Sequence, residues 1–253
     1  MKMKWVAALA ATSLVSIVSA GTRPASETTL EAMPKGLETQ FALSAAPPRL
    51  RDAASVYLLD PAKGYYLSRQ GTSGVTCIVQ RTDWEMPELR NDVYWPVCYD
   101  AVGTRTYLKT IMEAAALRAQ GLSATALKAA IEKRYRDKTY AVPDKAGVSY
   151  MVGPVMRAVG PPDMQVHTMA MPHLMFYAPF VTNEDIGAVP DFDDRSSLIY
   201  PFLDKHTENG AEHGYIIQPI GEAETAQILR DQKQLVDDLC AYRDVLCLQH
   251  AGH

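Results

Sequence analysis

Val56-Tyr57-Leu58-Leu59-Asp60-Pro61-Ala62-Lys63-Gly64-Tyr65-Tyr66-Leu67 is the stretch that decides the fold of this 253-residue chain. Two short runs of strand-forming residues flank an Asp-Pro-x-x-Gly connection, which is typical of an antiparallel hairpin. A second turn, Gly71-Thr72-Ser73-Gly74, leads into another apolar run that ends at Val79. The sequence therefore predicts a three-stranded antiparallel meander over residues 56–79.

Helical periodicity follows the meander. Residues 104–120 place Leu108, Ile111 and Ala115 on one face, and Gly121 supplies a stop just past the helix end. Ser123 is an expected N-cap for a second helix that runs to about residue 135. These two segments predict a helical hairpin. A weaker helix is expected over residues 37–45, ended by two prolines.

Strand patterns return between residues 141 and 221, with the best runs at 148–152, 174–177 and 215–218. Residues 222–246 then predict one long C-terminal helix with an acidic first turn, which suits the helix dipole. We therefore expect residues 37–253 to form a single α+β domain. In it, an antiparallel sheet of the early meander and the later strands packs against the helical hairpin and the long C-terminal helix.

The first twenty residues have the layout of a signal peptide. Lys2 and Lys4 precede an apolar run from Val6 to Val18, and Val18-Ser19-Ala20 offers small residues at a cleavage site. The run is too short to span a bilayer comfortably, and no later stretch is long enough. We expect residues 1–20 to be removed, residues 21–36 to be a flexible mature N-terminus, and the protein to be periplasmic or extracellular, with no stable membrane insertion.

Charge and composition narrow the expected partners. Beyond residue 20 the chain keeps 23 of its 25 Lys and Arg residues against 29 Asp and Glu residues, a formal charge of −6. No basic block is present, which argues against nucleic acid as a partner. Small molecules, metal ions and other proteins remain open.

Four cysteines are compatible with disulfides in an oxidising compartment. Cys77 and Cys98 each end an apparent strand, so we expect them to pair. Cys240 and Cys247 lie in the predicted long helix, where seven residues separate Cα atoms by about 10 Å, too far for a disulfide. Either that helix breaks near Arg243, or these two cysteines pair elsewhere or stay reduced.

The segment His167-Thr168-Met169-Ala170-Met171-Pro172-His173-Leu174-Met175 is the most unusual in the chain. Read with strand period, one side carries His167, Met169, Met171, His173 and Met175. Imidazole and thioether groups together suit copper, Cu(I) in particular, and zinc is a second possibility for the histidines. The alternative is ordinary packing, because methionine fills irregular cores and Pro172 disfavours a regular central strand.

Two polar segments contain further residues that could form a catalytic or metal-binding site. His206, Glu208, Asn209, Glu212 and His213 precede the strand at 215–218 and predict either an acid–base or metal site, or a solvated loop.

Asp191, Asp193 and Asp194 suggest either calcium ligands or a solvated turn, although the spacing of a calcium-binding loop is absent.

Three classes of function remain open. The leading hypothesis is a ligand-binding or accessory protein of the cell envelope, with His173 and His213 as ligand-binding residues and copper or zinc as the metal expected at His167, Met169, Met171, His173 and His213. The second is a secreted hydrolase with His213 or His173 as general base; a Cys77 nucleophile would require that cysteine to be unpaired. The third is an interaction module that exposes its Met-rich segment. The sequence contains no Gly-x-Ser-x-Gly, His-Glu-x-x-His, phosphate-loop or Cys-x-x-Cys motif, so no catalytic residue is assigned.

Three segments resemble an uncharacterised family of secreted bacterial proteins. They are Gly71-Thr72-Ser73-Gly74-Val75-Thr76-Cys77, Met171-Pro172-His173-Leu174-Met175-Phe176-Tyr177-Ala178-Pro179 and His213-Gly214-Tyr215-Ile216-Ile217. The resemblance covers most of the chain after residue 20 and implies export and a single domain. Because that family has no assigned activity, the resemblance implies no catalytic or binding residue.

Overall fold

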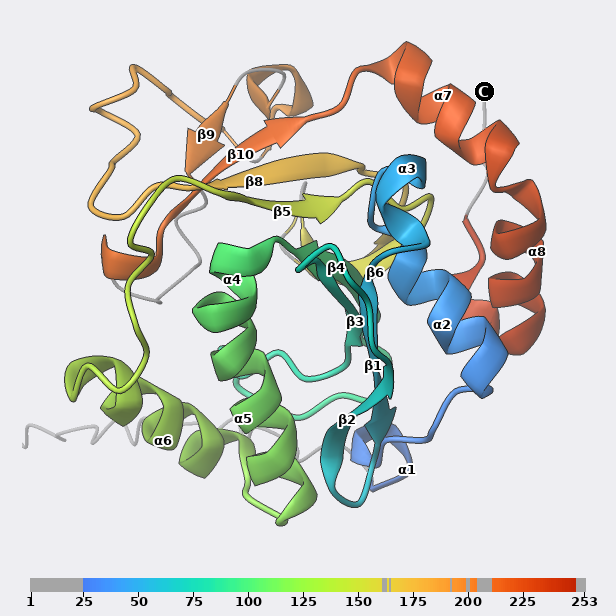
Figure 1. Cartoon of the computed structure of the whole chain (residues 1–253), viewed down its shortest axis with the longest axis horizontal. Coiled ribbons are helices and arrows are strands. Elements are labelled where there is room, and N and C mark those ends of the chain that lie inside the picture. Colours follow the sequence, from blue (N-terminus) through green and yellow to red (C-terminus); the bar gives the residue numbers. More distant parts are fainter. Residues whose placement is uncertain are drawn as a thin grey trace, which may run out of the picture.

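One large sheet runs through the computed structural model of the chain, with helices on both sides of its central strands (Figure 1). The structure describes residues 25–160, 163, 165–191, 193–198, 201–203 and 211–248, so the predicted signal peptide lies outside the described residues. The helices are α1 (Ala25–Thr28), α2 (Lys35–Ser44), α3 (Pro48–Arg51), α4 (Ala101–Arg105), α5 (Tyr107–Ala119), α6 (Ala124–Arg136), α7 (Glu222–Asp231) and α8 (Lys233–Tyr242), with 3-10 turns η1 (Arg195–Leu198), η2 (Ala211–His213) and η3 (Asp244–Leu246). The strands are β1 (Ser55–Asp60), β2 (Gly64–Arg69), β3 (Thr76–Gln80), β4 (Trp95–Tyr99), β5 (Val148–Met151), β6 (Met156–Gly160), β7 (Gln165–Met169), β8 (His173–Tyr177), β9 (Phe202–Leu203) and β10 (Tyr215–Pro219).

The main sheet has eight strands in the order β2-β1-β3-β4-β5-β8-β10-β9. The pair β1–β3 is parallel and the other neighbours are antiparallel, so the sheet is mixed rather than antiparallel as predicted. Strands β6 and β7 form a separate two-stranded sheet. The α+β class is confirmed.

The predicted meander is half right. Strands β1 and β2 form the expected hairpin, closed where Asp60 pairs with Gly64, whose φ of +95° favours glycine. Strand β3 instead lies on the far side of β1 and runs parallel to it. The reason is that the Gly71–Gly74 connection crosses the start of β1: the amides of Thr72 and Ser73 both donate to the carbonyl of Ala53.

Helices cover both faces of the central strands. In Figure 1, α2 and α8 lie on one side of β1, β3 and β4, while α4 and α5 lie on the other. Alternating residues of β3 divide between the two layers: Cys77 and Val79 pack with Phe41 of α2, and Ile78 packs with Leu108 of α5. All five residues of β3 are therefore buried, which explains why its central residues Cys77, Ile78 and Val79 are apolar without alternation.

The segment before α2, predicted to be flexible, makes specific contacts within the fold. Met33 is 4% exposed and belongs to the core under α2. The carbonyls of Thr28 and Glu31 accept hydrogen bonds from Arg118 and Arg81. Met33 and the carbonyls of Thr28 and Glu31 thus attach this segment to the fold.

The helical hairpin is confirmed as α5 and α6. Ser123 caps α6 by accepting a hydrogen bond from the amide of Ala126 at 3.3 Å. Gly121 has a φ of +88°, as a glycine at a helix end should.

The long C-terminal helix is broken twice. Gln232 leaves helical geometry between α7 and α8, and Arg243 is extended (φ −158°, ψ 120°) before η3. The second break folds the chain back, so that Cys240 and Cys247 lie 4.3 Å apart at Cα and form a disulfide. Cys77 and Cys98 form the predicted disulfide across β3 and β4. Among the described helices, none has the length and apolar character needed to cross a membrane.

Candidate ligand pocket

The His/Met segment does not form one strand. Its first part ends β7 in the small sheet, its last part begins β8 in the main sheet, and Pro172 lies in the turn between them. The side chain of His167 is 41% exposed and its Nε2 lies 2.6 Å from a carboxylate oxygen of Asp163. Met169 at the end of β7 packs against the core, as do Met171 and Met175. The five predicted metal ligands are therefore not gathered on one face.

A pocket lies where the second half of this segment enters the core. Its volume is about 140 Å³. Its wall is formed by Gln80, Trp84, Glu85, Trp95, Val97, Tyr99, Tyr107, Thr110, Ile111, Tyr135, Met151, Met156, Val159, Gly160, Met171, His173, Met175, Leu198, Phe202, Tyr215 and Ile217. We call it the aromatic pocket because seven of these side chains are Trp, Tyr or Phe.

Strand alternation selects the residues on the floor of the aromatic pocket. Residues 95, 97 and 99 of β4 line it, whereas Cys98 between them packs towards α2. In the same way β8 contributes His173 and Met175, and β10 contributes Tyr215 and Ile217. Helices α5 and α6 and strand β6 supply the opposite walls, so parts of the chain that are far apart in the sequence build the site.

The tyrosines of the aromatic pocket offer mainly ring surface. The hydroxyl of Tyr107 donates to the carbonyl of Gly214 at 3.1 Å, and that of Tyr135 lies 2.9 Å from the hydroxyl of Thr110. Burial raises the pKa of both phenols far above the usual value of 10, so they stay neutral. Because their hydroxyls already have protein partners, what these side chains give to a ligand is apolar and aromatic.

Few polar groups interrupt this surface. They are the side chains of Gln80, Glu85, Thr110 and His173. Nδ1 of His173, which is 3% exposed, donates to the carbonyl of Met171 at 2.8 Å. Because a carbonyl can only accept, this bond places a proton on Nδ1.

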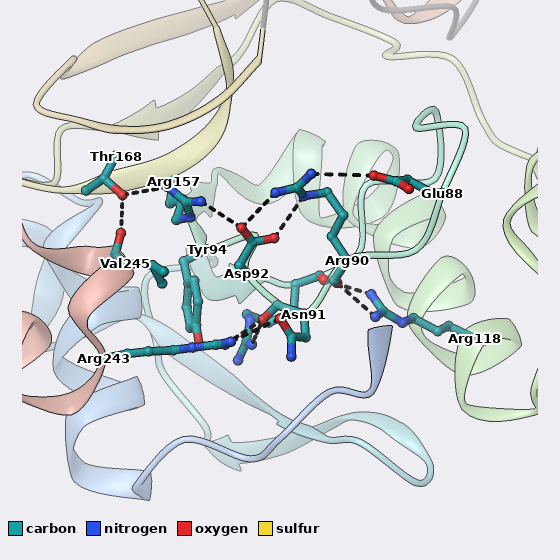
Figure 2. Close-up of polar contacts among 11 residues, drawn as sticks. Glu88, Arg90, Asn91, Asp92, Tyr94, Arg118, Arg157, Thr168, Arg243 and Val245 are labelled. Carbon is teal, nitrogen blue, oxygen red and sulfur yellow. Dashed lines mark hydrogen bonds and ion pairs between the residues drawn. The ribbon is translucent and has the colours of Figure 1, made fainter. Parts of the chain in front are cut away.

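An irregular loop of residues 81–94 carries Trp84 and Glu85, and arginines from other elements hold it (Figure 2). Arg118 of α5 donates to the carbonyls of Arg81 and Arg90, and Arg243 after α8 donates to the carbonyl and side chain of Asn91. These bonds satisfy carbonyls that a buried loop would otherwise leave unpaired. We call this set of contacts the arginine clamp.

Asp92 extends the arginine clamp to the small sheet. Its carboxylate accepts from Arg90 at 2.8 Å and from Arg157 of β6 at 2.7 Å (Figure 2). These two guanidinium groups hold the pKa of Asp92 well below its usual range. The backbones of Tyr94 and Arg157 also exchange two hydrogen bonds, so the loop and β6 are joined as two walls of the aromatic pocket.

His213 is not among the residues that line the aromatic pocket. Its ring packs against the rings of Tyr107 and Tyr135, which do line it, at centroid distances of 5.5 and 5.0 Å. It is 1% exposed, Nε2 lies 3.1 Å from the carbonyl of Ala141, and Nδ1 has no hydrogen-bond partner among the described residues. Burial lowers its pKa. His213 thus supports two aromatic side chains rather than lining the pocket.

The predicted pair His173 and His213 is not brought together. The β8–β10 register pairs His173 with Pro219 and Tyr177 with Tyr215. His213 precedes Tyr215, so at 3.3 Å per residue the two histidines stand about 13 Å or more apart along the sheet.

The remaining predicted sites are also accounted for. Within the described residues, no group of three or more His, Cys, Asp or Glu side chains is placed to hold a metal ion. Asp191 and Asp193 lie in an exposed turn closed by the hydroxyl of Ser197. His206, Glu208 and Asn209 lie outside the described residues, and Cys77 is in a disulfide, which removes it as a nucleophile.

Sequence reasoning found Met171, His173 and Met175 but missed the aromatic wall and the arginine clamp. Trp84, Tyr107 and Tyr135 are far apart in the sequence, and only the topology gathers them. Comparisons with protein-family models, with curated proteins and with solved structures found no match.

Proposed function

We propose that this protein binds a small, mainly apolar organic molecule in the aromatic pocket. The observation that carries the proposal is a pocket of about 140 Å³ lined by seven aromatic and four methionine side chains. An apolar cavity of about 150 Å³ in another protein takes up benzene, which sets the expected ligand size at about one aromatic ring. This proposal keeps the leading hypothesis, a ligand-binding protein, and moves its site from His173 and His213 to the aromatic pocket.

Binding outside the cytoplasm is part of the proposal. Two disulfides support it, because such bonds persist in oxidising compartments. The signal-peptide pattern of residues 1–20 supports it independently. These two features support the proposed role in the cell envelope.

Calorimetric titration with toluene and with indole tests the proposal. We expect dissociation constants of about 0.1–1 mM, since burying one ring contributes a few kcal/mol beyond the cost of association. Ile217→Trp should abolish binding by filling the aromatic pocket. Its control is Ile216→Trp, because Ile216 pairs with the exposed Phe176 on the opposite face of the sheet.

Binding that survives Ile217→Trp, or the absence of heat with either ligand in the wild-type protein, would contradict the proposal.

A second candidate is a soft metal ion in the same pocket. Met151, Met156, Met171, Met175 and His173 all line it, and thioethers with one imidazole suit Cu(I). Indole Nε1 of Trp95 donates to the sulfur of Met151 at 2.8 Å, so one of the four sulfurs already has a partner. The test is reconstitution with Cu(I) and mass spectrometry of the native protein. Met171→Leu with Met175→Leu should abolish copper uptake while leaving toluene binding intact.

A further inference from the structure

A disulfide lies beside the elements that build the aromatic pocket. Cys240 and Cys247 close a turn at the end of α8, and Arg243 leaves the helix inside it. We call residues 240–247 the disulfide turn. It makes hydrogen bonds to two of the elements that form the pocket, namely the 81–94 loop and the small sheet of β6 and β7.

The first contact is with the loop that carries Trp84, one of the lining residues. Arg243 donates to the carbonyl of Asn91 and to the hydroxyl of Tyr94, both at 2.8 Å (Figure 2). Arg118 of α5 binds the same loop from another element, so Arg243 supplies one anchor among several.

The second contact is with the small sheet. The hydroxyl of Thr168 in β7 donates to the carbonyl of Val245 and accepts from Arg157 of β6 at 3.2 Å (Figure 2). Arg157 also pairs with Asp92 of the loop, and Met156 of β6 lines the aromatic pocket. The disulfide turn therefore ties two walls of the pocket to each other.

The disulfide and an unbroken helix exclude each other. In a helix, seven residues separate Cα atoms by about 10 Å, whereas those of the two cysteines lie 4.3 Å apart. The periodicity of residues 222–246 favours a helix that continues past Arg243, yet Arg243 is extended. Once the bond is reduced, the turn regains the conformations that the cross-link excludes, a longer α8 among them. In a longer α8, Arg243 and the carbonyl of Val245 would no longer meet their partners.

A dithiol reductant has access to this bond. Cys240 and Cys247 are half-buried, whereas Cys77 and Cys98 are fully buried. A thiolate of the reductant attacks one sulfur of the accessible bond and forms a mixed disulfide, and its second thiol then displaces the protein sulfur. Two electrons and two protons pass from the dithiol to the protein. The protein gains two thiols, and the dithiol leaves as a cyclic disulfide.

We propose that the disulfide between Cys240 and Cys247 is a redox switch of the aromatic pocket. In the oxidised protein, the disulfide turn holds the 81–94 loop and the small sheet together. In the reduced protein, the turn loosens, the two walls separate more often, and the affinity for the ligand falls. The proposal rests on the proposed function and names the regulation of its site.

Calorimetry with toluene, before and after mild reduction with dithiothreitol, tests the switch. We expect the reduced protein to bind about tenfold more weakly, as it does when about a tenth of the molecules hold the binding-competent arrangement. Reoxidation should restore the affinity. Cys240→Ser with Cys247→Ser should bind as weakly as the reduced protein and should not respond to dithiothreitol. Arg243→Met should weaken binding with the disulfide intact.

Arg230→Met is the control for Arg243→Met, because Arg230 is exposed in α7 and contacts Gln227 of the same helix. It should leave the toluene affinity unchanged.

Hydrogen exchange supplies a readout that needs no ligand. The backbone amides of Tyr94 and Arg157 each donate to the carbonyl of the other residue, at 2.9 and 2.8 Å, and so join the loop to β6. Both amides should exchange about tenfold faster after reduction, while the amides of α6 keep their rates.

Equal toluene affinities in the oxidised and reduced protein would overturn the switch and leave the proposed function standing. Faster exchange throughout the chain, α6 included, would mean that reduction unfolds the protein and would also overturn the switch. The absence of toluene binding by the oxidised protein would overturn the proposed function together with the switch.

Discussion

Glu38 shows how burial changes the pKa of a single side chain. Its side chain is 2% exposed in the layer between α2 and β1, and a carboxylate oxygen accepts from the amide of Leu59 at 2.9 Å. Burial raises its pKa from 4.5 to about 7, opposed by that hydrogen bond and by Arg81. The folded state therefore holds a proton that the unfolded chain releases between pH 4.5 and 7.

The raised pKa of Glu38 predicts how the stability of the folded protein depends on pH. A raised folded-state pKa contributes stability that is fully present below pH 4.5 and is lost as the pH rises through about 7. Glu38→Gln keeps an oxygen for Leu59 and carries no charge. We expect its free energy of unfolding, relative to wild type, to improve by about 3 kcal/mol between pH 4.5 and pH 8. Urea unfolding at the two pH values measures the difference, and a constant offset would show that Glu38 is not responsible.

Gly103 has no side chain, and the space that a Cβ atom would take is filled by the side chain of Tyr177. A Cβ atom there would lie 1.9 Å from the hydroxyl oxygen of Tyr177, which donates to Asp100. Gly103→Ala should therefore destabilise the protein by about 2 kcal/mol through overpacking. The matched control is Gly36→Ala in α2, where no atom lies within 4 Å of the new methyl group and helix propensity predicts a gain of up to about 1 kcal/mol. Equal thermal stabilities for the two variants would contradict this account.

At the scale of elements, the arginine clamp decides the position of the 81–94 loop. Arg118 is 9% exposed and satisfies the carbonyls of Arg81 and Arg90 from α5. Arg118→Met keeps much of the apolar stem but leaves those carbonyls unpaired, so we expect a loss of about 3 kcal/mol and a red shift of the tryptophan emission as Trp84 becomes hydrated.

Arg105→Met is the control for the clamp, because Arg105 is an exposed residue of α4 that pairs with the exposed Asp144. It should change stability by less than about 0.5 kcal/mol. A similar loss of stability in both variants would contradict this account. It would mean that the effect comes from removing any arginine and not from losing the contacts of the arginine clamp.

The two disulfides should differ in accessibility. Cys77 and Cys98 are fully buried between the helix layers, whereas Cys240 and Cys247 are half-buried near the C-terminal end of α8. Thiol exchange requires access of the attacking thiolate. Under mild dithiothreitol we expect Cys240–Cys247 to be reduced first and Cys77–Cys98 only on unfolding, as measured by alkylation and mass spectrometry. Simultaneous reduction of both bonds in the folded protein would contradict the burial.

At the scale of the whole molecule, local patterns were predictable and long-range arrangement was not. The hairpin β1–β2, the pair α5–α6 and the strands β5, β8 and β10 follow from turn chemistry and periodicity. The parallel pairing of β1 with β3 depends on a connection that binds Ala53, and no local signal distinguishes that from a hairpin. The helix break at Arg243 was one of two alternatives that the cysteine spacing left open.

The same reasoning explains why only part of the site was found. The unusual composition of the His/Met segment drew attention to Met171, His173 and Met175, which do line the aromatic pocket. His167 was included by strand period, and the turn at Pro172 separates it from them. His213 was chosen for its position beside a strand, but the antiparallel register sends it to the opposite end from His173.

Occupancy of the aromatic pocket is the central claim, and diffraction tests it most directly. Crystals of the protein exposed to bromobenzene vapour should show an anomalous bromine peak between Trp95, Tyr107 and Met175. A peak there would place a one-ring ligand in the pocket, as the account predicts. No peak in the pocket, or bromine bound only on the outer face at Phe176 and Ile216, would contradict it.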